Sequence, residues 1–230
     1  MRGDLTVLFE DDWLFVVDKP SGLLVHRGYG ADEVTLVEMV ARRLGRAHPV
    51  HRLDRATSGV LVFAKSGDIA RDLQLQFQDG LVTKRYLALA RGHIREPVTV
   101  DHPVPKDEGG ERIDAVTDLV PLAHLDCAPR DVTWVEARPK TGRFHQIRRH
   151  LKHISHPVIG DSNYGKGPLN REFAAVHGLA RLALHAQGLR LVHPGDARPL
   201  VFEAPLPDDL LLPLRSMGFD FLPNDLGDLV

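Results

Sequence analysis

Apolar and polar residues vary along most of the chain with the short period of β-strands. Some of these segments alternate strictly, and others are short apolar runs between turn-forming residues, the pattern expected of buried strands. Strands are predicted over residues 6–10, 13–18, 59–64, 81–91, 115–125, 131–137, 182–192 and 199–202. The charged stretch 97–111, which contains several Pro and Gly residues, is predicted to be a loop or insertion.

Four segments have apolar residues at the three-to-four-residue spacing of an amphipathic helix. They are residues 34–44, 66–78, a segment beginning at Thr141 and extending to Ile154, and 208–217. Thr35 and Glu38 in the first helix have the spacing of a capping box, and Gly45 is a natural stop for it. Thr141 is predicted to cap the third helix, and the Gly-, Asn- and Pro-rich stretch that follows this helix is predicted to be a loop.

Strands and helices follow one another without regular β-α-β alternation, and the sequence contains neither an internal repeat nor a low-complexity tract. This order favours the α+β class over a doubly wound parallel sheet. The length of 230 residues fits one large domain or two small ones. Residues 203–230 form a predicted helix and tail in which acidic residues outnumber basic ones.

The composition is that of a globular protein, with 43% hydrophobic and 26% charged residues. No apolar window is long enough for a transmembrane helix, and the first ten residues lack the order of a signal peptide. Cys127 is the only cysteine, so neither an internal disulfide nor a four-cysteine zinc site can form. We therefore expect a cytoplasmic protein with no membrane partner.

The formal net charge of −2 hides a strongly basic segment, residues 137–160, which contains no Asp or Glu. Its cations are Arg138, Lys140, Arg143, Arg148, Arg149 and Lys152, and it also holds four histidines. A local basic stripe matters more for phosphate binding than the charge of the whole chain. The alternative is a solvated face of a helix, which is the usual meaning of a run of charges.

Residues 51–59, with the sequence HRLDRATSG, place His51, Arg52, Asp54 and Arg55 directly before a predicted buried strand. Packing of a core does not require such a cluster. Opposite charges on both sides should keep the carboxyl group of Asp54 ionised. A surface loop in which Asp54 forms a structural ion pair is an equally good interpretation of the charge pattern alone.

Two further segments combine charge with a defined local structure. Residues 140–148, KTGRFHQIR, open the third predicted helix, and a helix N-terminus beside Gly and Arg suits an anion. Residues 84–86, KRY, lie inside a predicted strand, where Tyr86 would more often pack than react.

Together these motifs resemble the RluA-type family of pseudouridine synthases. The family's motifs are matched in order by Lys19–Gly22 followed by His26, His51–Gly59, Lys84–Tyr86, Thr141–Arg148, His156–Asp161 and Leu184–Ala186. One such match would be weak, whereas six in order are specific. The resemblance implies a single catalytic domain over residues 1–230 without an S4-type RNA-binding domain. Its fold would be a mixed, mostly antiparallel sheet with flanking helices and loops around a catalytic cleft.

The resemblance also implies an isomerase that converts a uridine within RNA to pseudouridine, and it assigns roles to individual residues. Asp54 corresponds to the catalytic aspartate, which acts as a nucleophile or as a base at C2′. Tyr86 corresponds to the aromatic residue that stacks on uracil, and Arg148 to the basic partner of the aspartate. Arg52 would occupy the space left by the extruded base. The other expected RNA-binding residues are His51, Arg55, Thr57, Lys84, Arg143, His145, Gln146 and Arg149. No metal or organic cofactor is expected.

Within this family the chain is most similar to the tRNA pseudouridine(65) synthases, through residues 10–14, 148–151 and 154–157. The expected partner is therefore tRNA, modified in the acceptor stem, with ribosomal RNA of the 23S type as the alternative. Ala56 departs from the proline expected for this subgroup, and the 97–111 region is shorter or altered. No obligate protein partner is predicted.

Other classes of function fit the sequence less well. A non-catalytic RNA-binding module would not require Asp54, Tyr86 and Arg148 together. A metal-dependent hydrolase could use His145, His150, His153 and His156, but no carboxylate lies within that window and no ligand motif is present. A uridine methyltransferase would need a nucleophilic cysteine, and no motif surrounds Cys127.

Overall fold

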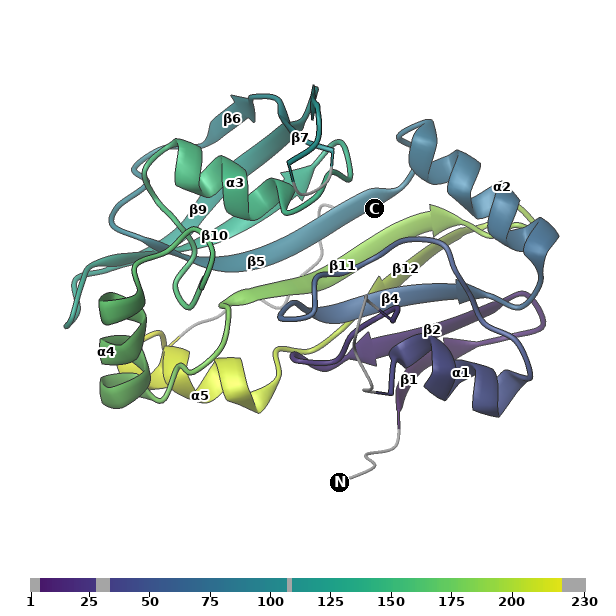
Figure 1. Cartoon of the computed structure of the whole chain (residues 1–230), viewed down its shortest axis with the longest axis horizontal. Coiled ribbons are helices and arrows are strands. Elements are labelled where there is room, and N and C mark those ends of the chain that lie inside the picture. Colours follow the sequence, from purple (N-terminus) through teal and green to yellow (C-terminus); the bar gives the residue numbers. More distant parts are fainter. Residues whose placement is uncertain (1–4, 28–33, 107–108, 221–230) are drawn as a thin grey trace. The chain divides into compact units, whose positions relative to one another are not determined.

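Strands dominate the computed structural model, which describes residues 5–27, 34–106 and 109–220 (Figure 1). The chain divides into two compact units. The first contains the described residues of Met1–Thr83 and Ala186–Pro205, and the second those of Lys84–His185 and Leu206–Asp225. Both units mix helices with mainly antiparallel strands, which confirms the predicted α+β class. That residues 1–230 act as one catalytic domain stays a prediction.

The first unit is built on strands in the order β1 (Thr6–Glu10), β2 (Leu14–Lys19), β4 (Ser58–Ala64) and β11 (Leu184–Val192). β12 (Pro199–Glu203) pairs antiparallel with β11, and the two-residue β3 (His48–Pro49) pairs with β4. Side chains from β2, β4, β11 and β12 form one core with α2 (Gly67–Gln78). All seven residues of β4 are buried, as its apolar sequence predicts.

Both helices of the first unit begin where the sequence places a cap. Thr35 and Glu38 form the complete capping box of α1 (Leu36–Leu44), because each side chain bonds to the other's backbone N–H. Ser66 accepts a hydrogen bond from Ile69 N and caps α2. The two helix starts are therefore set by local chemistry.

Gly59 allows β4 and β11 to approach closely. Its φ is +115°, and a Cβ atom there would lie 2.1 Å from the carbonyl oxygen of Ala186. No side chain can be accommodated without displacing the backbone of one strand. The glycine that ends the HRLDRATSG motif thus has a packing role in this unit.

The second unit contains strands in the order β5 (Thr83–Arg91), β10 (Val132–Pro139), β9 (Val116–Leu125) and β6 (Val98–Asp101), all antiparallel where they pair. Two short strands, β7 (Val104–Pro105) and β8 (Arg112–Ile113), form a separate pair. Figure 1 shows α3 (Gln146–His153) lying against β9 and β10, and α4 (Gly167–His177) beside α5 (Asp208–Met217). α5 has the predicted bounds.

Three expectations for this unit are wrong. The stretch 97–111 contains β6 and β7 and is not a plain loop. The stretch after α3 contains α4, which starts with Pro168 in its first turn and ends before Gly178 in the left-handed conformation. Pro in the first turn and Gly after the last residue are ordinary features of helix ends. The segment was nevertheless predicted to be a loop because it is rich in Gly, Pro and Asn. Thr141 does not cap α3, which begins five residues later at Gln146.

No helix within residues 5–27, 34–106 and 109–220 is both long and apolar enough to cross a membrane. The predicted acidic end begins with the last residue of β12 and includes α5, and residues 221–230 lie outside the described residues.

Candidate active site

Asp54 lies in the loop that connects β3 to β4, in the first unit. The backbone carbonyl of Asp54 accepts a hydrogen bond from Thr57 N at 3.0 Å, which closes a turn. At the start of the loop, the Nε2 atom of His51 accepts from Val62 N at 3.1 Å. Hydrogen bonds to Val62 of β4 and to Thr57, which directly precedes β4, therefore hold the segment that carries Asp54 at both ends.

Lys19, at the end of β2, is a fully buried lysine. Its ammonium group contacts the backbone carbonyl of Arg55, the residue that follows Asp54. Its Nζ atom donates to the carbonyl oxygens of Pro20, Leu23 and Arg55 at 2.9, 2.8 and 3.1 Å. An ammonium group has three protons, so these three carbonyls satisfy it. A buried charge is tolerated only with such partners, and this one fixes the backbone beside Asp54.

The turn that follows Lys19 adds further hydrogen bonds to the same loop. Gly22 N donates to Arg55 O at 2.8 Å, and the Nε atom of Arg55 donates back to Gly22 O at 2.9 Å. The hydroxyl of Ser21 donates to Ala56 O at 2.8 Å. Lys19 and Ser21 were not among the expected site residues, although the Lys19–Gly22 motif could have indicated them.

Arg52, expected to contact RNA, is exposed, and its charge acts on His26. Partial burial and the nearby Arg52 guanidinium both lower the pKa of His26. Asp54 and His51 are half-buried and Thr57 is buried. The first unit thus holds His51, Arg52, Asp54, Arg55 and Thr57 in one loop.

Arg148 belongs to the second unit, on α3, and is buried in an ion pair with Asp161. Its Nε and Nη2 atoms each donate to one carboxylate oxygen at 2.8 Å, a bidentate geometry. Burial alone would raise the pKa of Asp161, but the hydrogen bonds and charge of Arg148, with backbone N–H groups of Tyr164 and Asn163, lower it overall. The predicted pairing of Arg148 with Asp54 stays a prediction.

Aromatic rings and cations gather beside this pair. The guanidinium groups of Arg148 and Arg149 each lie 5.1 Å from the centre of the Tyr164 ring. The ring of His145 stacks on Phe144 at 3.8 Å, and its Nδ1 atom is 3.0 Å from the hydroxyl oxygen of Tyr164. The contacts are of the cation–π and stacking kinds that also recognise nucleobases.

The residues before α3 are organised by Gln146 instead of by a cap. The Oε1 atom of Gln146 accepts from the Thr141 hydroxyl at 2.6 Å and from Arg143 N at 3.0 Å. Its Nε2 atom donates to Val116 O and to the Thr117 hydroxyl oxygen, both at 2.9 Å. His145 is the N-cap, with a left-handed φ of 54° and no side-chain cap.

Lys84 and Tyr86 are half-buried residues at the start of β5. The Nζ atom of Lys84 donates to Thr141 O at 3.0 Å. Burial, with a smaller effect from the charge of Arg143, lowers the pKa of Lys84 to about 8. Tyr86 lies opposite Ala137 in the pairing of β5 with β10. Between them, Arg85 forms a buried ion pair with Glu136.

The four histidines of the basic segment have different surroundings. His145 contacts Tyr164, His150 is bonded to the Thr117 hydroxyl and to His102 O, and His156 to Arg91 O. The ring of His153 stacks on His102. Among the residues that the structure describes, the group able to share a cation is a different one, His93 with Asp126 and Asp131.

Comparison with known proteins gives a consistent result. The sequence model of the family described as RNA pseudouridylate synthase matches residues 13–153. The tRNA pseudouridine synthase C of Vibrio cholerae is 37% identical, over 88% of this chain and 91% of that protein. The protein of the same name from Pasteurella multocida is 40% identical, over 83% and 86%.

Solved structures agree with the sequence matches. Human RNA Pseudouridylate Synthase Domain Containing 1 superimposes with a TM-score of 0.74 and 32% identity, covering 90% of this chain and 86% of that one. Human RNA Pseudouridylate Synthase Domain Containing 4 gives 0.73 and 26%, with 92% of each chain covered. The predicted resemblance is confirmed: the chain belongs to the RNA pseudouridylate synthase family.

Proposed function

We propose that this protein converts a uridine of tRNA to pseudouridine, with Asp54 as its catalytic carboxylate. The observation that carries the proposal is the match, over most of both chains, to curated relatives named as tRNA pseudouridine synthases. The fixed loop of the first unit supports it, because a carboxylate must be held still to act on a single ribose carbon. At a finer level, we propose uridine 65 in the acceptor stem as the target.

The reaction moves no atoms to another molecule. The N1–C1′ bond breaks, the uracil turns, C5 bonds to C1′, and the proton of C5 is lost while N1 gains one. Asp54 begins the reaction at the ribose, as a nucleophile at C1′ or as a base at C2′. Tyr86 stacks on the uracil, and Arg52 fills the space that the extruded base leaves.

The second unit supplies binding groups for the RNA backbone and the base. Lys84, Arg143 and Arg149 provide positive charge, and His145 provides a hydrogen-bonding group directly before α3. Gln146 holds the segment with Arg143 in place through its bonds to Thr141 and Arg143 N. Arg148 balances a carboxylate charge during the reaction, in addition to the ion pair that it forms with Asp161.

The test is an assay of the purified protein on unmodified tRNA and 23S ribosomal RNA transcripts, with pseudouridine mapped by position. We expect modification of tRNA at position 65. Asp54→Asn should abolish it without loss of RNA binding, because the amide has nearly the same shape but is neither a base nor a nucleophile. Asp72→Asn, at an exposed position of α2, is the matched control and should keep full activity.

Each contrary outcome removes a different step of the proposal. Modification of ribosomal RNA alone would reject tRNA as substrate and leave the family assignment standing. Modification of tRNA at another position would reject only position 65. Substantial isomerisation by a pure Asp54→Asn preparation would reject Asp54 as the catalytic carboxylate.

A further inference from the structure

A pocket of about 220 Å³ lies between α3 and the β7–β8 strand pair of the second unit, and part of its wall belongs to the stretch 97–111 that was expected to be a loop or insertion. Its walls come from three segments that are distant in sequence. They are lined by His102, Val104, Pro105, Arg112, Arg149, Lys152, His153 and Tyr164. Three of these residues are permanent cations and two are imidazoles, and no carboxylate is among them.

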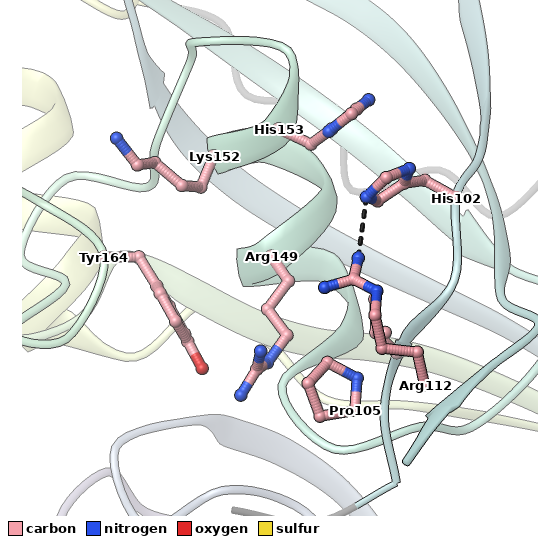
Figure 2. A pocket seen from close by; sticks show the side chains of 8 residues that line it. His102, Pro105, Arg112, Arg149, Lys152, His153 and Tyr164 are labelled. Atoms are coloured by element: carbon pink, nitrogen blue, oxygen red, sulfur yellow. Dashed lines mark hydrogen bonds between the residues drawn. The ribbon is translucent and has the colours of Figure 1, made fainter. Parts of the chain in front are cut away.

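Arg149 is the central cation of this pocket. Figure 2 shows its side chain extending from α3 between Tyr164 on one side and Pro105 and Arg112 on the other. Its guanidinium lies over the Tyr164 and Phe144 rings, at 5.1 and 5.7 Å. Within the described part of the chain, its buried Nε atom has no hydrogen-bond partner. A buried donor without a partner is costly and marks a place where an acceptor is expected.

Arg112 and His102 form the opposite wall. The Nη2 atom of Arg112 donates to the Nε2 atom of His102 at 2.7 Å and also to the carbonyl of Pro103. Because arginine can only donate, this nitrogen of His102 is the acceptor and carries no proton. The His102 ring stacks on His153 at 3.7 Å, with an angle of 18° between the planes. Both rings therefore line the pocket as flat surfaces.

Within the described residues, none of the three cations of the pocket forms an ion pair. Asp161, the first acidic residue after the basic segment, already forms an ion pair with Arg148. Lys152 is exposed and, within the described residues, makes no ion pair. Two guanidinium groups and an ammonium group around one cavity repel one another, and a bound anion relieves that repulsion. Guanidinium groups prefer a phosphate or carboxylate, which they can bind through two hydrogen bonds.

We propose that this pocket binds a backbone phosphate of the substrate RNA through Arg112, Arg149 and Lys152. This inference rests on the proposed function, because that function makes RNA the polyanion that the protein meets. Flat imidazole and tyrosine surfaces beside the cations suit the sugar and base next to that phosphate. The β7–β8 pair then acts as an RNA-positioning element.

The experiment measures the affinity of the full-length protein for an unmodified tRNA transcript at several salt concentrations. Arg112→Gln and Lys152→Gln should each reduce the slope of log K against log salt by about one, and the double variant by about two. At 0.1 M salt each loss corresponds to roughly eightfold weaker binding. Arg112→Lys keeps the charge and should keep the slope.

Arg130→Gln is the matched control, because Arg130 is exposed and precedes the end of β10 that is remote from the pocket. It should leave the slope unchanged. Lys152 is exposed and lies on the polar side of α3, so Lys152→Gln should fold normally. It therefore tests the proposal even if Arg112→Gln proves to be misfolded. Slopes equal to that of the control for both pocket variants would overturn the proposal.

A second arm compares inorganic phosphate with chloride at equal ionic strength, using thermal stability as the measure. Stabilisation by phosphate that is lost in Arg112→Gln, with an unchanged RNA slope, would assign the pocket to a small free anion and overturn its role in RNA binding. The isomerase assay separates this inference from the proposed function. Wild-type protein that modifies no RNA rejects the function, whereas normal modification with unchanged slopes rejects only the pocket.

Discussion

The guanidinium of Arg148 donates two hydrogen bonds of 2.8 Å to the two carboxylate oxygens of Asp161, and both side chains are almost completely buried. Asp161 also accepts from the backbone N–H groups of Asn163 and Tyr164 at 2.9 and 3.0 Å. One carboxylate therefore fixes both a cation of α3 and the turn that carries Tyr164.

Asp161→Asn should lower the free energy of unfolding by about 3–5 kcal/mol, because it leaves the charge of Arg148 buried without its counter-ion. Urea denaturation measures this. Asp209→Asn removes the exposed partner of Arg181 and should cost less than about 1 kcal/mol. The lowered pKa of Asp161 means that its stabilisation is present above the usual aspartate range and is lost as the pH falls below it. Equal effects of the two substitutions would contradict a structural role for this pair.

Substitution of Arg52 and of Arg148, the two arginines expected near the uridine, should impair different steps of the reaction. Arg52→Ala should impair productive capture of folded RNA, because extrusion costs a few kcal/mol that the arginine partly offsets. A transcript whose target uridine is already unpaired should restore much of its activity. Arg148→Ala should not be rescued in this way, since its defect lies in the chemical step.

Single-turnover kinetics on paired and unpaired substrates separate these two defects. Arg148→Ala also leaves the carboxylate of Asp161 buried without its counter-ion. The double variant Arg148→Ala with Asp161→Ala therefore serves as its control for folding. Rescue of both arginine variants, or of neither, would reject the proposed division of roles.

Lys84 should titrate near pH 8, because burial and then Arg143 disfavour its charged form. RNA binding should therefore weaken between pH 7 and 9, and this change should be absent in Lys84→Met. The folded pKa lies below the unfolded value of 10.5, so the unfolded chain binds more protons between these values. Stability should accordingly rise with pH across that window. Amine labelling followed by peptide mapping measures the midpoint, and a midpoint near 10.5 would contradict the assignment.

Lys19→Met should reduce the rate of the chemical step more than it changes KM, because it removes the donor that three carbonyls around the Asp54 loop share. It should also lower stability by several kcal/mol, roughly 1–3 for each unsatisfied buried acceptor. Lys65→Met is the control, since Lys65 makes a more exposed ion pair with Glu10. A Lys19→Met variant with normal kcat would show that the loop is held by other contacts.

Sequence patterns predicted those elements whose ends are fixed by local chemistry. The capping box of Thr35 and Glu38 placed the predicted helix within two residues of the start of α1 at Leu36, and the apolar run after Ser58 indicated a buried strand. The start of α3 was wrong because the side chain of Gln146 accepts hydrogen bonds from both Thr141 and Arg143 N. That arrangement depends on β9, a strand far away in sequence whose Val116 carbonyl accepts from Gln146. The residues around Thr141 alone could therefore not predict it.

The same limit applies to the candidate site. The motif that contains Asp54 was visible in the sequence, but the role of Lys19 depends on carbonyl oxygens that only the folded backbone brings together. Asp161 stood in a quoted motif, yet no pattern of charges could select it as the partner of a residue on α3. The pocket around Arg149 could not be predicted, because three of its eight lining residues, His102, Val104 and Pro105, come from a stretch expected to be irregular.

The loop around Asp54 also has a consequence for how enzymes of this kind can change over time. Its shape is set largely by main-chain carbonyls at positions 54, 55 and 56, which accept from Thr57 N, from Lys19 and Gly22 N, and from Ser21. The residues that specify the geometry are thus largely not those that would perform the chemistry. The exposed Arg52 can be exchanged while these main-chain contacts persist, so the RNA preference can change by single substitutions while Asp54 is kept.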